Sequence, residues 1–197
     1  MPNQKTMNRR KFISSLFILA GGAAATYYGT EYLELIDNPD FNFLDQHKDL
    51  IGDLAETIIP ATDTPGAKEA MVHEYIIHMI KHERDVKIQN NFINGIKDLK
   101  EYAFSEYKLP FGKLNKEQKV AVVRYFQKEG ENFKGNLGKV RNKFLGKSFF
   151  LILKEYTCIG YCTSMLGVTK SLAYQAIPSK YLAITNYSSG QKSWATK

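Results

Sequence analysis

The sequence has little of what marks a disulfide scaffold, a membrane span or a nucleotide-binding enzyme. It contains only two cysteines in 197 residues, so no disulfide framework organises it. Its most apolar stretch, near the N-terminus, is short and interrupted by glycines. A G-x-S-x-G nucleophile motif, a phosphate loop and a dinucleotide fingerprint are all missing. By elimination, we expect no catalytic residues and no independent enzyme.

The net charge of +7 does not predict nucleic-acid binding. Four basic residues lie among the first eleven, and removing them leaves +3 with the two signs intermixed along the chain. No motif of a nucleic-acid-binding fold accompanies the charge. We therefore expect no nucleic-acid partner.

The first 25 residues have the layout of an export signal. Arg9 and Arg10 precede a mildly apolar run that starts at Phe12 and reaches small residues by Ala25. The arginine pair followed by Phe12 resembles the twin-arginine signal, whose translocase carries folded proteins. We expect a twin-arginine-type segment at residues 1–25 and a periplasmic protein. The alternative is an uncleaved signal that stays in the membrane.

The rest of the chain has helical periodicity. Residues 26–44 are rich in Tyr, Asp and Asn and include the turn-forming stretch IDNPDFN, so we expect an extended or loosely docked connector. From Asp45 onward, apolar residues recur at helical spacing, and no useful strand alternation appears. We expect an all-α, compact bundle of about five helices over residues 45–197, with an irregular tail from about Val168.

The stretch IIPATDTPGA separates the first two expected helices. Pro60 should end the first helix at the residue before it. Thr64 should cap the second helix, with Pro65 at its first position. Thr62 and Asp63 should bond to backbone groups, with Asp63 near the positive end of that helix. These features predict a rigid corner and no catalytic role for Asp63.

Later helix ends also have local signals. Asn115 and Gln118 form a capping-box pattern at the start of a helix. The apolar run over residues 137–166 predicts one helix, or two helices broken near Gly146. Gly167 should end this run in the left-handed conformation.

Two groups of side chains are candidate ligands. Glu74, His78 and His82 lie at steps of four on one expected helix face, a spacing that can hold a metal ion. The sequence lacks the H-E-x-x-H pattern of zinc proteases, and the alternative is a solvated face with a Glu74–His78 pair. We expect no metal ligand here.

Cys158 and Cys162 are also four residues apart, which makes a disulfide within one helical turn awkward. Two thiols at this spacing can bind a metal or the edge of a haem. The interpretation that we favour is two small buried side chains beside Gly160 and Ser164, where another helix approaches closely. No C-x-x-C-H motif is present, so we expect no covalent haem.

Two segments together resemble the gluconate 2-dehydrogenase subunit 3 family. LAETIIPATDTPGAKEAMVHEYI, residues 54–76, matches the family's I-I-P and A-T-D-T-P-G-A pattern between two helices. YTCIGYCTSMLGVTKSLAYQAIPSKY, residues 156–181, resembles its G-Y-x-T-S, L-x-Y and P-G-Y elements, with Ser179 in place of a glycine. The resemblance makes the following residues candidates for partner binding or for the structure of the loop: Pro60, Thr62, Asp63, Thr64, Pro65, Gly66, Tyr161, Ser164, Tyr174, Pro178 and Tyr181.

The resemblance implies a non-catalytic accessory subunit of a membrane-associated oxidoreductase complex. Its family partner is a large FAD-dependent dehydrogenase of the glucose-methanol-choline (GMC) type, which oxidises a sugar or a sugar acid. Often a cytochrome c subunit accepts the electrons. FAD would then lie in the partner and haem c in a third subunit, with no cofactor in this chain. The large subunit generally lacks an export signal, so the small subunit would carry it through the twin-arginine translocase.

Two other functions are compatible with the residues. The first is a free-standing exported helical protein that binds a metal or carries out redox chemistry through the histidines or the cysteines. The second is a membrane-attached structural protein with an uncleaved N-terminal helix.

Overall fold

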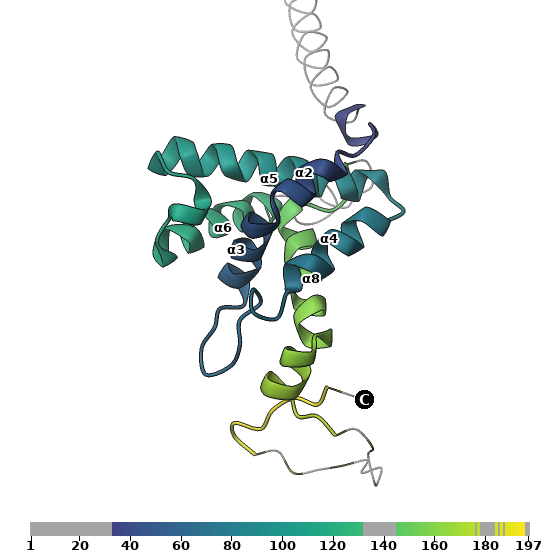
Figure 1. Ribbon diagram of the computed structural model, residues 1–197, viewed down its shortest axis with the longest axis vertical. Helices are drawn as coiled ribbons and strands as arrows, with labels where there is room; N and C mark the ends of the chain where they lie inside the picture. The colour runs from purple at the N-terminus through teal and green to yellow at the C-terminus, as the bar shows by residue number, and fades with distance from the viewer. Residues whose placement is uncertain are drawn as a thin grey trace, which may run out of the picture.

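Five helices of eleven or more residues make up most of the chain that the structure describes (Figure 1). The computed structural model describes residues 33–131, 145–175, 177, 184, 186 and 188–195. The helical elements are, in chain order, α2 (Phe41–Gln46), α3 (Lys48–Ile58), α4 (Val72–His82), α5 (Val86–Tyr107), the 3-10 turn η1 (Phe111–Lys113), α6 (Lys116–Glu131), α8 (Phe149–Thr163) and the π-helical turn η2 (Gly167–Ser171). Over these residues, strand pairing is limited to one bridge between Ala173 and Trp194. The predicted all-α fold of about five helices is confirmed.

Helix α8 lies at the centre of the bundle and contacts α3, α4, α5 and α6 (Figure 1). The interior is apolar: Leu54 of α3, Phe92 of α5 and Leu153 of α8 are at most 1% exposed. Gly95 lets α5 and α8 approach, because a Cβ at this position would overlap the Phe149 ring. The periodic apolar residues in the sequence therefore form one shared core.

A partly buried polar contact joins α8 to the end of α4. The Tyr156 hydroxyl donates a hydrogen bond to Glu83 Oε2 at 2.7 Å. This bond lowers the pKa of Glu83. Burial and the same bond raise the pKa of Tyr156. At neutral pH the pair is thus a neutral phenol donating to a carboxylate.

The described part of the expected connector, from residue 33 to residue 44, is helical at both ends and has two buried side chains, so the prediction of an extended or loosely docked segment was wrong there. The Asp40 side chain caps α2. Leu35 is 3% exposed, and Leu44 is fully buried. The Asn90 amide donates to the Leu35 carbonyl at 3.0 Å. Capping and apolar burial together dock this segment on the bundle.

His47 separates α2 from α3, a break that the helical spacing from Asp45 onward did not indicate. Its backbone leaves the helical region, with φ −113° and ψ 24°. Lys100 donates to His47 Nε2 at 2.6 Å, and Nδ1 donates to the Phe43 carbonyl at 2.8 Å. These side-chain bonds hold the bend.

Three predicted helix boundaries are confirmed. Helix α3 ends at Ile58 with Ile59 as its C-cap, directly before Pro60. The capping box exists: Gln118 N–H donates to Asn115 Oδ1 at 2.8 Å, and Asn115 N–H donates to Gln118 Oε1 at 3.0 Å. Gly146 has φ +80° and lies at the expected break before α8.

The prediction for Gly167 was wrong, because its φ is not positive and α8 has already ended at Thr163. The Ser164 hydroxyl donates to the Tyr161 carbonyl at 2.8 Å and accepts from the Gly167 N–H at 3.0 Å. Glycine is required for space, since a Cβ there would overlap the Tyr161 carbonyl. A serine therefore ends this helix. Beyond η2, the described residues are irregular apart from the single bridge.

The expected signal residues Arg9, Arg10 and Phe12 lie outside the described residues. Within the ranges that the structure describes, no helix combines the length and the hydropathy that a bilayer crossing requires.

Candidate functional site

The loop that carries the A-T-D-T-P-G-A stretch projects from the helical body beside the C-terminal half of α8 (Figure 1). The second helix begins at Val72 rather than near Pro65, so Thr64 caps no helix and Asp63 lies away from a helix N-terminus. Turns precede the helix instead, and Met71 adopts a left-handed φ of 53°. The predicted helix start was therefore wrong.

Glu56 on α3 supplies the acceptors that this loop needs. Its Oε1 accepts from the Ala61 N–H and its Oε2 accepts from the Lys68 N–H, each at 2.8 Å. Gly66 packs against this carboxylate, and a Cβ on Gly66 would overlap it. The Ala67 N–H also donates to the Ile59 carbonyl at 2.9 Å. One carboxylate therefore holds both sides of the loop. The expected corner is present, but hydrogen bonds to Glu56 fix it, and not a helix start at Pro65.

Asp53, one turn before Glu56 on α3, is paired with two lysines. Lys68 Nζ lies 2.6 Å from Oδ1, and Lys119 Nζ on α6 lies 3.1 Å from Oδ2. Burial alone would raise the pKa of Asp53, but the hydrogen bonds from Lys68 and Lys119 outweigh it and hold the pKa below its usual range. This trio links the loop, α3 and α6.

Tyr161 of α8 joins the loop to the C-terminal segment. Its hydroxyl donates to the Pro65 carbonyl at 2.5 Å and lies 2.6 Å from the Ser171 hydroxyl, which acts as donor in turn. The neighbouring Gly160 lets α4 approach, since a Cβ there would lie 2.6 Å from Tyr75 Cδ1. The two sequence segments that carry the family resemblance therefore meet at one tyrosine.

We call the loop of residues 59–71, together with residues 161–174, the loop end of the molecule. Thr62 and Asp63 are exposed there. Contrary to the prediction, their side chains make no hydrogen bond with other described residues; the Thr62 N–H donates to the Thr64 carbonyl at 3.0 Å. Two polar side chains at the tip of a well-anchored loop are thus free to contact another molecule.

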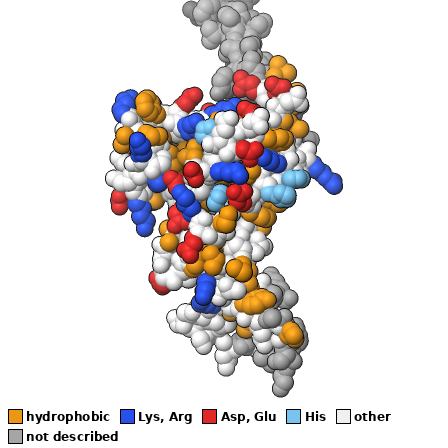
Figure 2. Space-filling view, in the orientation of Figure 1, with side chains coloured by type: hydrophobic (Ala, Val, Ile, Leu, Met, Phe, Trp, Pro, Cys, Tyr) orange, Lys and Arg blue, Asp and Glu red, His pale blue; other side chains and the backbone are white. Residues whose placement is uncertain are grey.

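Large apolar side chains are exposed at the same end of the molecule, where Figure 2 shows orange surface over the C-terminal segment. Met165 is 78% exposed and Tyr174 is 52% exposed. Pro178 and Tyr181, the remaining residues of the predicted set, lie outside the described residues. Exposed apolar groups beside free polar ones are typical of protein-binding surfaces.

The histidine face of α4 is exposed, and its pairs differ from those expected. The His78 and His82 rings lie 4.2 Å apart, and His82 Nδ1 lies 2.8 Å from the His78 carbonyl. Glu74 pairs with Lys48 at 3.4 Å and with His73 at 3.8 Å, so the predicted Glu74–His78 pair was wrong. No three His, Cys, Asp or Glu side chains are grouped for a metal ion within the described part of the chain.

Both cysteines are free thiols. Cys158 is half-buried, whereas Cys162 is exposed, so the prediction of two buried thiols was wrong for Cys162. The expected close helix approach is present at Gly160. Burial raises the pKa of the Cys158 thiol.

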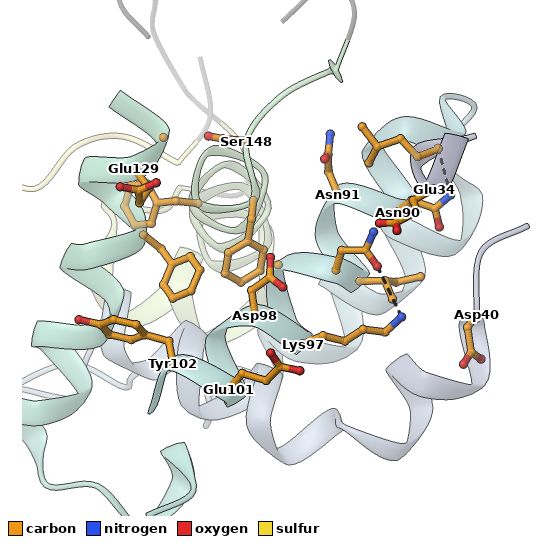
Figure 3. Close-up of a pocket in the computed structure, with 18 of the residues that line it drawn as sticks. Glu34, Asp40, Asn90, Asn91, Lys97, Asp98, Glu101, Tyr102, Glu129 and Ser148 are labelled. Carbon is orange, nitrogen blue, oxygen red and sulfur yellow. Dashed lines mark hydrogen bonds between the residues drawn. The ribbon is translucent and has the colours of Figure 1, made fainter. Parts of the chain in front are cut away.

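A hollow of about 990 Å³ lies between α5, α6, the start of α8 and the segment before α2 (Figure 3). Aromatic side chains line part of it, and the ring centroids of the stacked Tyr102 and Tyr125 lie 4.1 Å apart. Removal of water and the nearby Glu101 carboxylate raise the pKa of Asp98. Its acidic lining residues are Glu34, Asp37, Asp40, Asp98, Glu101 and Glu129, with Lys97 as a basic one. The hollow therefore disfavours anions.

Sequence reasoning missed Glu56 and Ser171, which fix the loop and Tyr161. Neither belongs to a periodic pattern. Glu56 stands four residues before the helix-ending Pro60, within reach of the loop N–H groups, and that spacing was the available signal. Ser171 depends on the η2 turn, which no local signal indicated.

Among protein-family models, that of gluconate 2-dehydrogenase subunit 3 matches residues 45–178. The matched region contains both the loop and Tyr161. No curated protein and no solved structure matches the chain. Because the family match covers well over half of the 197 residues, the chain belongs to the gluconate 2-dehydrogenase subunit 3 family.

Proposed function

We propose that this chain is a non-catalytic accessory subunit that binds, helps to mature and co-exports an FAD-dependent, GMC-type sugar or gluconate 2-dehydrogenase. The observation that carries the proposal is the Tyr161–Pro65 hydrogen bond. It joins the two family segments into one end of the molecule, where the loop is anchored from within by Glu56. Family membership supports an accessory role in such a complex.

The loop end is the proposed docking surface for the flavoprotein. Thr62 and Asp63 present polar groups that are not used within the described chain, and Met165 and Tyr174 add exposed apolar area. Aromatic and apolar side chains surrounded by polar groups contribute most of the binding energy at protein interfaces. Because the loop is held by backbone hydrogen bonds to Glu56, little ordering entropy is lost when the partner binds.

The chemistry of the complex lies in its other subunits under this proposal. FAD is bound by the flavoprotein, and haem c by a cytochrome subunit where one is present. The arginine pair at Arg9 and Arg10 directs the folded complex through the twin-arginine translocase to the periplasm. The complex is held at the membrane through its partners or through an uncleaved signal.

The test is co-expression of this chain with its GMC-type flavoprotein, followed by fractionation and FAD analysis. We expect the flavoprotein to reach the periplasm with full FAD only when this chain is present. Replacing Arg9 and Arg10 by Lys should leave both proteins in the cytoplasm, still bound to each other. A flavoprotein that is exported, FAD-loaded and active without this chain would contradict the proposal.

A further inference from the structure

The exposed side of α8 carries two free thiols that the proposed accessory role does not use. Cys162 is exposed, and Cys158 is half-buried. Cys158 borders a separate cavity of about 490 Å³, whose other lining residues are Lys147, Leu151, Lys154 and Glu155. Both cysteine residues are therefore accessible from the surface of the molecule.

The spacing brings the two thiols together. Both residues lie within the continuous helix Phe149–Thr163. Residues four apart on a helix have Cβ atoms about 5–6 Å apart. Helical side chains lean toward the N-terminus, so the Cys162 thiol points toward the turn that carries Cys158. Two sulfur atoms so placed can reach one ion with bonds of roughly 2.3 Å, the length of a zinc–thiolate bond.

Two basic side chains, Lys147 and Lys154, line the same cavity as Cys158. Lys147 is already paired with Glu155 at 2.7 Å. Two thiolates and a monovalent cation carry one net negative charge, which Lys154 offsets.

We propose that Cys158 and Cys162 form a binding site for one soft, thiophilic cation of low coordination number, such as Cu(I). Thiolates select soft cations. Zn²⁺ sites use at least three protein ligands, and the described residues provide no third His, Cys, Asp or Glu here. On binding, two S–H bonds break, two protons leave to solvent and two sulfur–metal bonds form. The oxidation state of the metal and of the sulfur does not change.

The test is an anaerobic titration of the reduced full chain with Cu(I) against a colorimetric Cu(I) chelator. A thiol assay should first give two free thiols per chain. We expect the wild type to withdraw one Cu(I) per chain from the chelator. Cys158→Ser and Cys162→Ser should each lose this stoichiometric binding.

The control is the double variant His78→Ala/His82→Ala, which keeps both thiols and should bind as the wild type does. Alkylating the exposed Cys162 of the folded wild type provides a second way to remove one ligand without a substitution. If the wild-type chain fails to withdraw Cu(I) from the chelator, the proposed site is overturned. Retained binding after the loss of either thiol, or lost binding in the histidine variant, would overturn it as well.

Discussion

The helical interior and the loop end are held together by different kinds of contact. In the interior, apolar side chains from the five longest helices pack on one another, and Phe92 and Leu153 are at most 1% exposed. At the loop end, a few hydrogen bonds hold the structure: Glu56 accepts from two backbone N–H groups, and Tyr161 donates to one backbone carbonyl. Interior stability is therefore spread over many contacts, whereas the shape of the loop depends on single side chains. Substitutions should separate folding from the proposed partner binding.

The largest expected effect is in the interior. Phe92→Ala should lower the free energy of unfolding by about 3–5 kcal/mol, because it removes a fully buried ring between α5 and α8. The matched control is Phe104→Ala on the same helix, where the ring is 58% exposed and the expected change is within about 0.5 kcal/mol. Chemical denaturation measures both. Similar losses for the two variants would contradict the assignment of the core.

The next effect should be local to the loop end. Glu56→Ala leaves the Ala61 and Lys68 N–H groups without their acceptor, so it should destabilise the loop by about 1–3 kcal/mol. Amide hydrogen exchange should accelerate at these two positions and stay slow in α5. Glu69→Ala, an exposed change in the same loop, is the control. Unchanged protection of the two amides would show that Glu56 does not hold the loop.

Asp53 connects the loop end to the helical interior through its two lysine partners. Its contribution to the free energy of unfolding should depend on pH. Asp53→Ala should cost about 1 kcal/mol near pH 7, because the ion pairs are partly exposed. The folded pKa of Asp53 is lowered, so its contribution is present above the unfolded pKa of about 4 and is lost as the pH falls through the folded pKa. The difference between wild type and variant should shrink on acidification. A stability difference that grows on acidification would contradict the lowered pKa of Asp53.

The smallest effect concerns the acidic hollow beside the interior. The folded pKa of Asp98 is raised, so its ionised form destabilises the fold at pH values above that pKa. Asp98→Asn should therefore raise the free energy of unfolding by up to about 0.5 kcal/mol near pH 7. The gain should vanish below the unfolded pKa of about 4, where both states bind the proton. Thermal unfolding at the two pH values measures it, and a loss of stability near pH 7 would be the opposite result.

The interior was predictable because periodicity reports which residues face a core. Phe92, Ile96 and Leu99 recur in the sequence at the spacing of one helix face, and all three are buried in α5. The capping box was predictable for a similar reason, since both partners lie within four residues. The break at His47 was missed because it depends on Lys100, which is distant in sequence.

The loop end was predictable only in part. Pro60 fixed the end of α3, because proline restricts the residue before it whatever the tertiary structure. The start of α4 was misplaced because the preference of Thr64 and Pro65 for a helix start was overridden by contacts from Glu56 and Tyr161. Such contacts join distant segments, and no local pattern encodes them.

The central claim is that the loop end binds the flavoprotein subunit, and an affinity titration tests it most directly. The double variant Thr62→Ala/Asp63→Ala removes exposed groups that make no hydrogen bond within the described chain, so its unfolding free energy should match that of the wild type. Against the purified GMC-type flavoprotein, we expect the variant to bind at least roughly tenfold more weakly, about 1.4 kcal/mol. Phe104→Ala on α5 should bind as tightly as the wild type. Wild-type affinity in the loop variant, or an equal loss in the Phe104 control, would contradict the claim.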